Sequence, residues 1–569
     1  MTARTHLADS YLPAPTRPVH SASIPFYDDR AGDGSTSLFD SPYGRSPYQD
    51  PAVQDPAVSP YEGQVVPVRG GPAPAYHSPL FAPVPSPAAE PFHPDRPQLY
   101  PTSQPYPTSH YGAGHPGEQY GTARLHLVTS QDASPHRVGL DGSQLLDGQV
   151  LYRSSDRMRE RGPQADGLIE HRFRYGERPR MIGIAAEQLI AEMELAALTG
   201  RGGAHFPVAR KWRAVLEAGG GGVVVANGAE GEPASAKDMA LLQHRPHLVL
   251  DGIAIAVEAL GATGAVVWLH SAAVESLRSV HRALAERRAA GADDPPITIV
   301  TGPDSYLSGE SSAVVRALDG APVLPAFRRT PAARSGVGGL PTLVQNVETL
   351  ARVGLLARTG GGAMQPGPLL TVVGEGTLTV VEVPVHTTLG AAAQLGSVSR
   401  PLGPGTARAV LVGGFGGRWV PWSQAAEVPL AHLDGRNRPS LGAGIVALAE
   451  EDVCGISETA AVVDYLAASS ARQCGPCIFG TRELADVLKR IAEGRPRRGD
   501  DERVFSLDRE IRKRGACGMP DGAVNIALSA LETFAADVEA HLAGHPCVHS
   551  GQRGILPVPG RAFRGTPRW

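Results

Sequence analysis

Residues 222–233 read Gly-Val-Val-Val-Ala-Asn-Gly-Ala-Glu-Gly-Glu-Pro, an apolar run that passes directly into a polar loop. Residues 222–226 are predicted to form a short buried strand. Polar side chains at the carboxyl end of such a strand lie where open α/β sheets bind ligands. The amide of Asn227 can read donors and acceptors of a planar ring, and Glu230 and Glu232 can accept from ribose hydroxyls. A solvated loop explains the same residues equally well.

Helices and strands alternate after this first strand. Apolar residues at helical spacing predict helices over 184–198, 247–260, 273–289 and 312–318. Short β-type runs predict further strands over 265–269 and 297–300. Such alternation favours a parallel α/β sheet.

The second half of the chain changes character twice. Two β runs within 369–385, with a turn at 374–376, and strands over 409–412 and 444–448 predict a small mixed β domain. Residues 456–544 are predicted to be helical throughout, with loops at 494–501 and 515–522, and so to form a small bundle.

The first 120 residues hold 23 of the 51 prolines and 10 of the 14 tyrosines. With few branched aliphatic residues this stretch cannot bury enough apolar surface to offset chain entropy, so we expect a disordered tail. Residues 121–182 are transitional and uninformative.

Composition excludes some functions. The net charge of −4 gives no reason to expect nucleic-acid binding. No apolar run is long enough to cross a membrane, and the first thirty residues lack a signal-peptide core. Five scattered cysteines do not make a disulfide framework, so we expect a reducing cytoplasm.

A glycine-rich loop, Gly-Arg-Gly-Gly-Ala-His-Phe-Pro, occupies residues 200–207. Gly200 and Gly202 let backbone N–H groups approach an anion closely, while Arg201 and Lys211 supply positive charge for a phosphate. A plain tight turn is the alternative interpretation.

Two later motifs have the same mixed character. In residues 306–311, Tyr306 can stack on a flat ring for which Gly309 leaves room, although Ser-Gly-Glu-Ser is also typical of a helix cap. Residues 341–349 bring two amide side chains, Gln345 and Asn346, into an apolar run.

Three of the five cysteines form one pattern: Cys474 and Cys477, separated by two residues, and Cys517 after a long gap. Thiolates that converge on one point hold soft metals and iron–sulfur clusters. The alternatives are a redox dithiol, a zinc knuckle, or cysteines packed as small hydrophobic residues.

Taken together and in this order, the motifs resemble the NADH-oxidising flavoprotein subunit of respiratory complex I, a family shared with NAD-linked hydrogenases and formate dehydrogenases. The resemblance covers residues 183–545 and marks the chain as a divergent member. The family patterns GRGGAGFP, NxDExEP, YxxGEE, PTxxNNVET and CxxCxxC…C align with residues 200–207, 227–233, 306–311, 341–349 and 471–517.

The resemblance implies a fold of three parts. These are a Rossmann-like FMN and NADH domain over 183–360, a ubiquitin-like β-grasp (SLBB-like) domain over 361–455, and a helical bundle over 456–546 that holds a [4Fe–4S] cluster. A C-terminal tail follows over 547–569. In the family NADH gives a hydride to FMN, and electrons leave singly through the cluster.

Site residues carry over from the family to the matching positions. The resemblance implies catalytic roles for Glu230, Tyr306 and Glu310, and cluster ligation by Cys474, Cys477 and Cys517. It implies FMN or NADH binding by Gly200, Arg201, Gly202, Phe206, Lys211, Asn227, Glu232, Gly309, Gln345 and Asn346.

The cluster motif departs from the family at its first position, where Ala471 replaces a cysteine. Three thiolates can hold a [3Fe–4S] cluster, or a [4Fe–4S] cluster with another fourth ligand. Cys454 and Cys547 are candidates for that ligand, and inert buried thiols are the alternative.

The NADH side departs as well. Ala229 and Ser311 replace carboxylates, His205 replaces a loop glycine, and Ala214 stands where the family has an aromatic. A second aromatic is missing from residues 328–331. Losing a stacking contact costs about 1–3 kcal/mol, so we expect NADH binding to be weaker by about one to four decades.

The leading hypothesis is therefore an electron-transfer flavoprotein that passes electrons from NADH through FMN and an iron–sulfur cluster to a partner. The partner is a ferredoxin-like or thioredoxin-like iron–sulfur protein, or a membrane reductase that would hold the chain at the membrane surface without insertion. One alternative is a non-catalytic docking subunit whose sites have decayed. Another is zinc bound by Cys474, Cys477, Cys517 and a histidine such as His545.

Overall fold

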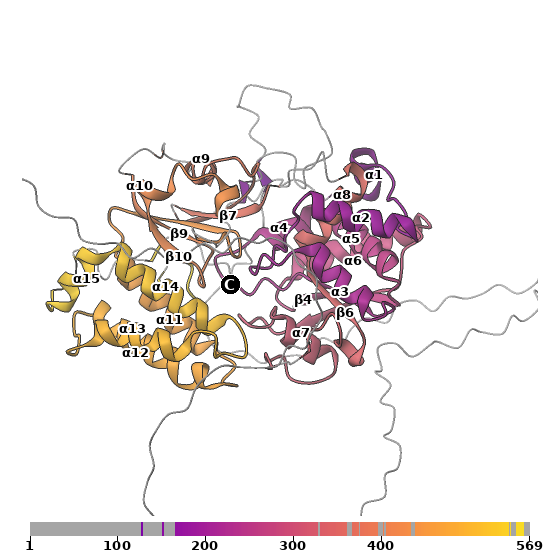
Figure 1. The fold of residues 1–569 in the computed structure, drawn as a ribbon. Helices are drawn as coiled ribbons and strands as arrows, with labels where there is room; N and C mark the ends of the chain where they lie inside the picture. The colour runs from indigo at the N-terminus through magenta and orange to yellow at the C-terminus, as the bar shows by residue number, and fades with distance from the viewer. Residues whose placement is uncertain are drawn as a thin grey trace, which may run out of the picture. The chain divides into compact units, whose positions relative to one another are not determined.

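The computed structural model describes residues 127–128, 151–152, 166–327, 330–360, 367–374, 376–396, 402, 406–433, 439–545, 547 and 554–562. All of them lie in one compact unit, Tyr76–Trp569 (Figure 1). The expected tail over 1–120 and most of the segment 121–182 fall outside the described residues.

A four-stranded parallel sheet forms the first half of the described chain. Its order is β5-β4-β3-β6, and every neighbouring pair is parallel. Its strands are β3 (Val223–Asn227), β4 (Gly264–His270), β5 (Ile297–Gly302) and β6 (Thr342–Asn346). The predicted α/β parallel sheet is thus confirmed, but β6 was missed because two amides interrupt its apolar pattern.

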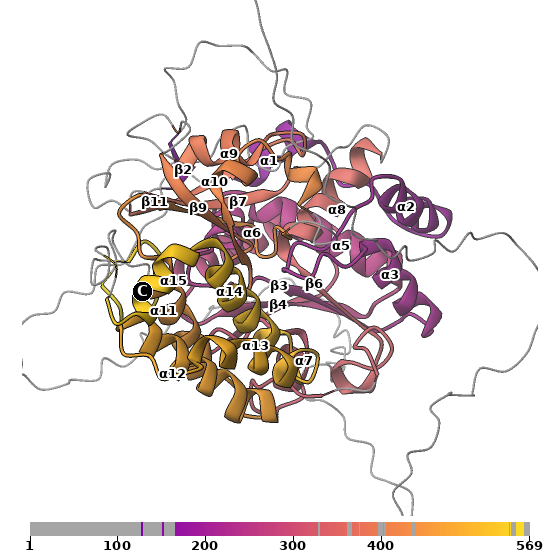
Figure 2. The same cartoon turned by 60° about the vertical axis from the view of Figure 1, so that its left-hand side comes forward.

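Both faces of this sheet are covered, which explains its nearly continuous apolar strands. Val224 and Ala226 join the core formed with the long helices, whereas Val223 and Val225 pack towards α7. Figure 2 shows α2, α3, α5 and α8 on one side of the strands and α7 on the other. The helices are α1 (Leu168–Tyr175), α2 (Ile184–Leu195), α3 (Val208–Glu217), α4 (Lys237–His244), α5 (Pro246–Leu260), α6 (Val274–Ala289), α7 (Ser311–Leu318) and α8 (Val347–Thr359).

The sheet has a topological switch point. The chain runs from β3 outward through β4 and β5 and then returns to place β6 on the other side of β3. Asn227 and Asn346 are register partners at the carboxyl ends of these two strands. Open α/β sheets bind ligands at this position.

A second, mixed sheet has the order β10-β9-β11-β7-β8. The hairpin β7–β8 is antiparallel, as the turn at 374–376 predicts, and β11 lies parallel to β7 in the centre of the sheet. The elements are β7 (Leu369–Gly374), β8 (Thr377–Glu382), α9 (Leu389–Gly396), β9 (Ala407–Val412), β10 (Arg418–Pro421), α10 (Trp422–Ala425) and β11 (Ile445–Glu450). A short ribbon of β1 (Leu127–Val128) and β2 (Leu151–Tyr152) is antiparallel.

The last part of the chain is the predicted bundle, with corrections to its loops. Its helices are α11 (Gly455–Ala468), α12 (Thr481–Ala492), α13 (Asp500–Ile511), α14 (Met519–Thr533) and α15 (Ala535–Leu542). The prediction of uninterrupted helix from 456 is wrong, because residues 469–474 are not helical and a π-helical turn, Pro476–Gly480, follows. The loop expected at 515–522 ends earlier, since α14 begins at Met519 with proline in its first turn.

Hydrogen bonds join the three parts. Glu348 Oε1 accepts from the backbone N–H of Leu369 at 3.1 Å, which fixes β7 to α8. The indole of Trp419 on β10 donates to Thr459 Oγ1 of α11 at 2.9 Å. In the part of the chain that the structure describes, no helix is long and apolar enough to cross a bilayer.

Candidate functional site

The glycine-rich loop lies over the end of β6. Gly200 N donates to Phe206 O at 2.9 Å, which closes the loop, and Arg201 N donates to Thr349 Oγ1 of α8 at 2.9 Å. A Cβ added to Gly202 would lie 3.5 Å from the Cβ of Asn346. The structure therefore brings residues 200–207 to the switch point, as the sequence predicts.

The loop after β3 packs directly on the Tyr306 loop. Asn227 Nδ2 donates to Gly309 O at 2.7 Å, and its Oδ1 accepts from Ala229 N at 3.2 Å. A Cβ on Gly309 would lie only 2.5 Å from Ala229 O, so close backbone approach requires glycine there. Asn227 therefore holds two loops together, and sequence alone gives no sign of this partner.

Glu230 and Glu310 cap helices. Glu230 accepts from the backbone N–H groups of Asp238 and Met239 at 3.2 and 3.1 Å, at the start of α4. Glu310 Oε2 accepts from Ser312 N at 2.9 Å at the start of α7. Both carboxylates orient the loops of the site. Their catalytic assignment stays a prediction, and the geometry gives them a positioning role.

Tyr306 and Glu232 together link the three parts of the chain. The Tyr306 hydroxyl donates to Glu232 Oε2 at 3.3 Å, and Glu232 Oε1 accepts from Phe415 N at 2.7 Å. The Tyr306 ring meets that of Tyr465 on α11 edge-on, with centroids 6.0 Å apart. Burial raises the pKa of Glu232 to about 7. Burial and the Glu232 carboxylate raise the pKa of Tyr306 well above its usual value, so the phenol remains a proton donor.

A buried cluster of three charged side chains holds Asn346 in place. Lys237 Nζ lies 2.8 Å from Asp238 Oδ1 and 3.1 Å from Glu348 Oε2, and Asn346 Nδ2 donates to Asp238 Oδ2 at 2.7 Å. Burial raises the pKa of Asp238 to about 7, although Lys237 opposes that shift. The role of the Lys237–Asp238 pair becomes visible only through its partner Glu348, which lies more than a hundred residues away in the sequence.

Gln345 offers the clearest sign of a ligand-binding site. Its side chain is 2% exposed, and within the described residues its Oε1 has no hydrogen-bond partner. A Cβ on Gly200 would lie 3.8 Å from the Gln345 Nε2 atom, so the amide sits against the glycine loop. A buried acceptor without a donor is costly, and a hydrogen-bonding planar ligand would satisfy it.

Charged and aromatic groups flank this amide. Lys211 Nζ donates to Val344 O at 3.1 Å, and burial lowers its pKa. Burial, with Arg352 nearby, lowers the pKa of Arg201 to about 10. Phe206 is 43% exposed, and its ring lies 5.8 Å from the guanidinium carbon of Arg210. These groups fit a phosphorylated flavin, with Phe206 accessible to a further ring.

The three pattern cysteines gather beside Tyr306. Burial and the neighbouring sulfurs of Cys474 and Cys517 raise the pKa of Cys477 to about 12. Burial, Glu310 and Cys474 also raise the pKa of Cys517, and Cys517 in turn acts on Tyr306. Cys477 and Cys517, whose pKa values are raised, need a nearby cationic centre to become thiolates, and iron supplies one.

Neither Cys454 nor Cys547 can be the fourth cluster ligand. Cys454 is the N-cap of α11, whereas Ala471 and Cys474 follow the other end of this 14-residue helix. The helix separates its ends by about 21 Å. Cys547 lies with Cys454, because both contact His541. Both candidates from the sequence are therefore wrong.

The zinc alternative with His545 fails for the same reason. His545 precedes Cys547 by two residues and donates its backbone N–H to Ala540 O at 3.0 Å, at the end of α15. His545 therefore lies near the N-terminal end of α11, whereas Cys474 follows the C-terminal end of that helix.

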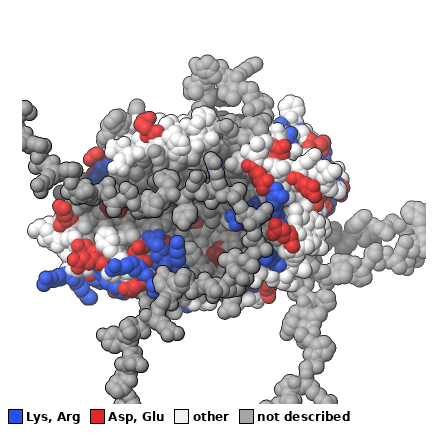
Figure 3. Space-filling model, in the orientation of Figure 1, with Lys and Arg blue, Asp and Glu red and all other residues white. Residues whose placement is uncertain are grey.

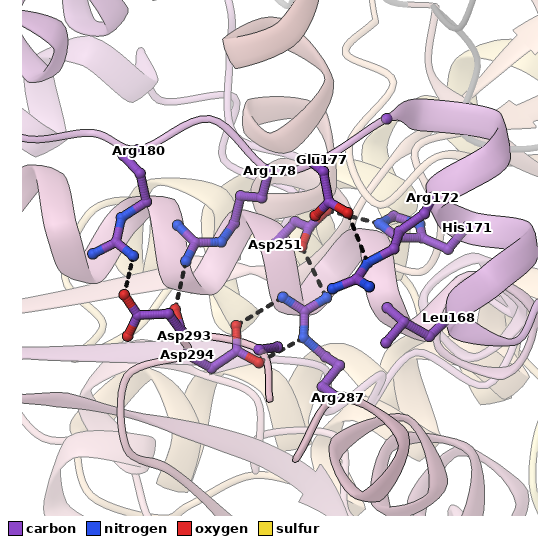
Figure 4. Close-up of a pocket in the computed structure, with 12 residues that line it drawn as sticks. Leu168, His171, Arg172, Glu177, Arg178, Arg180, Asp251, Arg287, Asp293 and Asp294 are labelled. Carbon is purple, nitrogen blue, oxygen red and sulfur yellow. Dashed lines mark hydrogen bonds and ion pairs between the residues drawn. The ribbon is translucent and has the colours of Figure 1, made fainter. Parts of the chain in front are cut away.

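A separate cavity of about 150 Å³ lies between α1, α5 and α6 (Figure 4). Arg287 bridges Asp251 at 2.9 Å and Asp294 at 2.7 Å, and Arg178 pairs with Glu258 at 2.7 Å. Burial acts to raise the pKa of Asp251, yet His171 and Arg287 hold it below its usual range. Because these charges are paired internally, the cavity is best interpreted as a structural ion network.

Charges on the outer surface of the bundle are mixed. Figure 3 shows basic and acidic side chains side by side at the lower left of the view, where Figure 1 places α12 and α13. Arg503 pairs with both Glu483 and Glu510 at 2.6 Å. This face therefore has neither a basic nor an acidic patch.

Comparison with known proteins agrees with this geometry. Residues 193–355 match the Nuo51 FMN-binding domain, and residues 457–541 match the NADH-ubiquinone oxidoreductase-F iron-sulfur binding region. The F subunit of the NADH-quinone oxidoreductase of Streptomyces coelicolor is 29% identical over 391 residues, which are 65% of this chain and 86% of that protein. The HndC subunit of the NADP-reducing hydrogenase of Solidesulfovibrio fructosivorans is 27% identical over 395 residues, 65% and 79% of the two chains.

Solved structures give the same result. The H2-reduced NAD+-reducing [NiFe]-hydrogenase superposes with a TM-score of 0.57 at 29% identity. The match spans 63% of this chain and 63% of the hydrogenase chain, less than two thirds of that chain's length. The comparisons confirm the resemblance predicted from the motifs, together with FMN and an iron–sulfur cluster as its cofactors.

Proposed function

The chain is a flavoprotein of the NADH dehydrogenase type with an FMN-binding domain and an iron–sulfur region, and on that premise we propose that it oxidises NADH and passes the electrons to a partner redox protein. The observation that carries this proposal is the contact of the Tyr306 ring with that of Tyr465 on α11, with centroids 6.0 Å apart, together with the electrostatic effect of Cys517 on Tyr306. Both support cluster ligands that adjoin the flavin site. When bound, FMN converts a two-electron donor into single-electron steps.

The residues divide into holding and positioning roles. Gly200 and Gly202, with Arg201 and Lys211, would hold the phosphate of FMN, and the flavin would supply a donor to the buried Gln345 Oε1. Asp238 holds Asn346, which would face the flavin ring; Gly309 would leave room for that ring, and Tyr306 would keep its proton beside it. Phe206 would stack on the adenine of NADH. Glu232 orients Tyr306, and Asn227, Glu230 and Glu310 fix the loops.

The second sheet supports the finer fold assignment. A hairpin, a helix and a last strand that lies parallel to the first in the sheet centre are the arrangement of a β-grasp domain. We assign this fold to residues 367–450, between the flavin domain and the bundle.

The cluster takes three protein ligands, Cys474, Cys477 and Cys517. With Cys454, Cys547 and His545 excluded by distance, the forms that remain are a [3Fe–4S] cluster and a [4Fe–4S] cluster whose fourth ligand is neither of those cysteines.

The electron acceptor is an iron–sulfur partner of ferredoxin-like or thioredoxin-like type, in the cytoplasm and peripheral to any membrane reductase. The relatives are named as subunits, which supports an assembly. Next to Cys477, the side chains of Ile478 and Phe479 are 46% and 71% exposed, and Phe505 is 53% exposed. Apolar side chains beside a cluster are suited to docking a redox partner.

Anaerobic reconstitution of the full chain with FMN, iron and sulfide tests the function. We expect bound flavin that bleaches on titration with NADH and a cluster signal in electron paramagnetic resonance. Cys474→Ser is the matched control, which should lose the cluster signal and keep flavin bleaching. Protein that binds no flavin would refute the enzymatic role. Flavin that bleaches with dithionite but not with NADH would leave a docking subunit or another electron donor.

A further inference from the structure

Two cysteines that the redox site does not use lie together with a histidine. The ligand atoms of Cys454, His541 and Cys547 all fall within 4.8 Å of one another. Cys454 is 3% exposed and His541 is fully buried. Cys454 caps α11, His541 lies in the last turn of α15, and Cys547 follows that helix. Figure 2 shows α15 beside α11.

Their spacing matches tetrahedral coordination. Cys454 Sγ lies 3.5 Å from His541 Nε2. In a tetrahedral zinc site with ordinary bond lengths, sulfur and nitrogen ligand atoms lie about 3.5 Å apart and two sulfurs about 3.8 Å. The three side chains can thus share one ion with little movement.

The surrounding hydrogen bonds hold the three side chains together. Cys547 N donates to His541 Nε2 at 3.3 Å, so this nitrogen carries a lone pair, which a bound metal would take in place of the hydrogen bond. Within the described residues, the other ring nitrogen, Nδ1, is buried without a hydrogen-bond partner. Ser457 N donates to Cys454 Sγ at 3.4 Å, which fixes the sulfur at the start of α11.

We propose that Cys454, His541 and Cys547 bind one zinc ion, with solvent as the fourth ligand, at a site distinct from the iron–sulfur cluster. Two thiolates and an imidazole form a donor set that favours zinc over magnesium or calcium. The site lies at the opposite end of α11 from Cys474, so the five cysteines divide into three for iron and two for zinc.

The ion fastens the end of the bundle to its beginning. Arg408 already ties this junction, because it donates to Val453 O at 3.1 Å and pairs with Asp537 at 3.0 Å. Further along, the backbone N–H groups of Ile555 and Leu556 donate to Glu458 at 3.2 and 3.1 Å. An ion bound only by the folded chain stabilises it by mass action.

Cobalt substitution in the full chain tests the proposal. In a Cys474→Ser, Cys477→Ser, Cys517→Ser background only the proposed site can give thiolate-to-cobalt bands. We expect tetrahedral cobalt bands, one metal ion per chain by native mass spectrometry, and displacement of cobalt by zinc. Adding Cys547→Ser, a change outside any helix, should abolish the bands, and His541→Asn should do the same.

The unsubstituted protein supplies a second measurement, which does not depend on any variant folding. After purification without a histidine tag, mild chelation should release one zinc ion and lower the melting temperature by several degrees, while flavin fluorescence and cluster absorption persist. A Cys454–Cys547 disulfide in the isolated protein, an absence of zinc, or zinc that disappears only with the iron-ligand substitutions would overturn the proposal. None of these readouts depends on NADH oxidation.

Discussion

At the scale of single residues, Gln345 separates ligand binding from folding. Gln345→Leu removes a buried acceptor that lacks a partner within the described chain. The apoprotein should therefore keep or gain stability, whereas FMN loses a hydrogen bond of about 1.5 kcal/mol and binds at least about tenfold more weakly. Fluorescence titration and thermal unfolding of the apoprotein measure the two effects.

The control for this change is Gln473→Leu, on an exposed glutamine in the loop before Cys474. It should leave the dissociation constant of FMN unchanged. If Gln345→Leu instead lowers apoprotein stability and leaves FMN affinity intact, the amide is structural and the flavin lies elsewhere.

The positive φ of His205 is expected to strain the backbone and to lower the stability of the protein. His205 stands where the family has glycine, and its φ is +49°. A left-handed conformation costs a residue with a Cβ about 1 kcal/mol or more, so His205→Gly should be more stable than His205→Ala by about that amount. Urea unfolding of both variants checks this. At His281 in the middle of α6 the order should reverse, because alanine is the better helix former.

Residue types reveal candidates, but not partners. The glycine loop, the thiols and the amides of the site are visible in the sequence because few residue types perform those roles. The capping by Glu230 and Glu310 is not visible, since a carboxylate before a helix can equally face a ligand. The pairing of Lys237 with Glu348 joins residues more than a hundred positions apart, which only the folded chain can reveal.

At the scale of elements, two strands of the large sheets, β6 and β10, were not predicted from the sequence. β6 carries Gln345 and Asn346 among apolar residues, and β10 contains four residues and ends at a proline. In both, tertiary pairing with β3 or β9 decides the conformation over local preference. The two amides proposed to bind the flavin are thus the residues that prevented the prediction of β6.

The loop between α11 and the π-helical segment contains Ala471, where the family has a cysteine, so Ala471→Cys would restore a fourth thiol. Ala471 is half-buried and packs on the same core as Cys474 and Cys517. Ala471→Cys should therefore give a [4Fe–4S] cluster with four thiolates, which is paramagnetic when reduced. A wild-type [3Fe–4S] cluster would be paramagnetic when oxidised.

Electron paramagnetic resonance in both redox states distinguishes these forms. Gln473→Cys is the matched control, because its side chain is exposed two residues further along the same loop. Identical spectra for the wild type and Ala471→Cys would mean that the cluster already has four ligands.

At the scale of the whole molecule, Glu232 joins the flavin domain to the second sheet and, through Tyr306, to the bundle. Burial raises its pKa from 4.5 to about 7. The unfolded chain therefore releases this proton at lower pH than the folded chain does. The contribution of Glu232 to stability is greatest below pH 4.5 and falls as the pH rises to about 7, by at most about 3 kcal/mol.

Glu232→Gln removes this proton linkage and keeps an acceptor for Phe415 N. The melting temperature of the variant should match that of the wild-type apoprotein near pH 5 and exceed it near pH 8, since only the wild type must then bury a charge. The exposed Glu493→Gln should show no such divergence. A Glu232→Gln variant that is less stable at pH 8 than at pH 5, relative to wild type, would mean that the carboxylate is ionised in the fold. In that case Tyr306 is held by a charged partner, and the three parts of the chain are joined by an ionic contact instead of a neutral one.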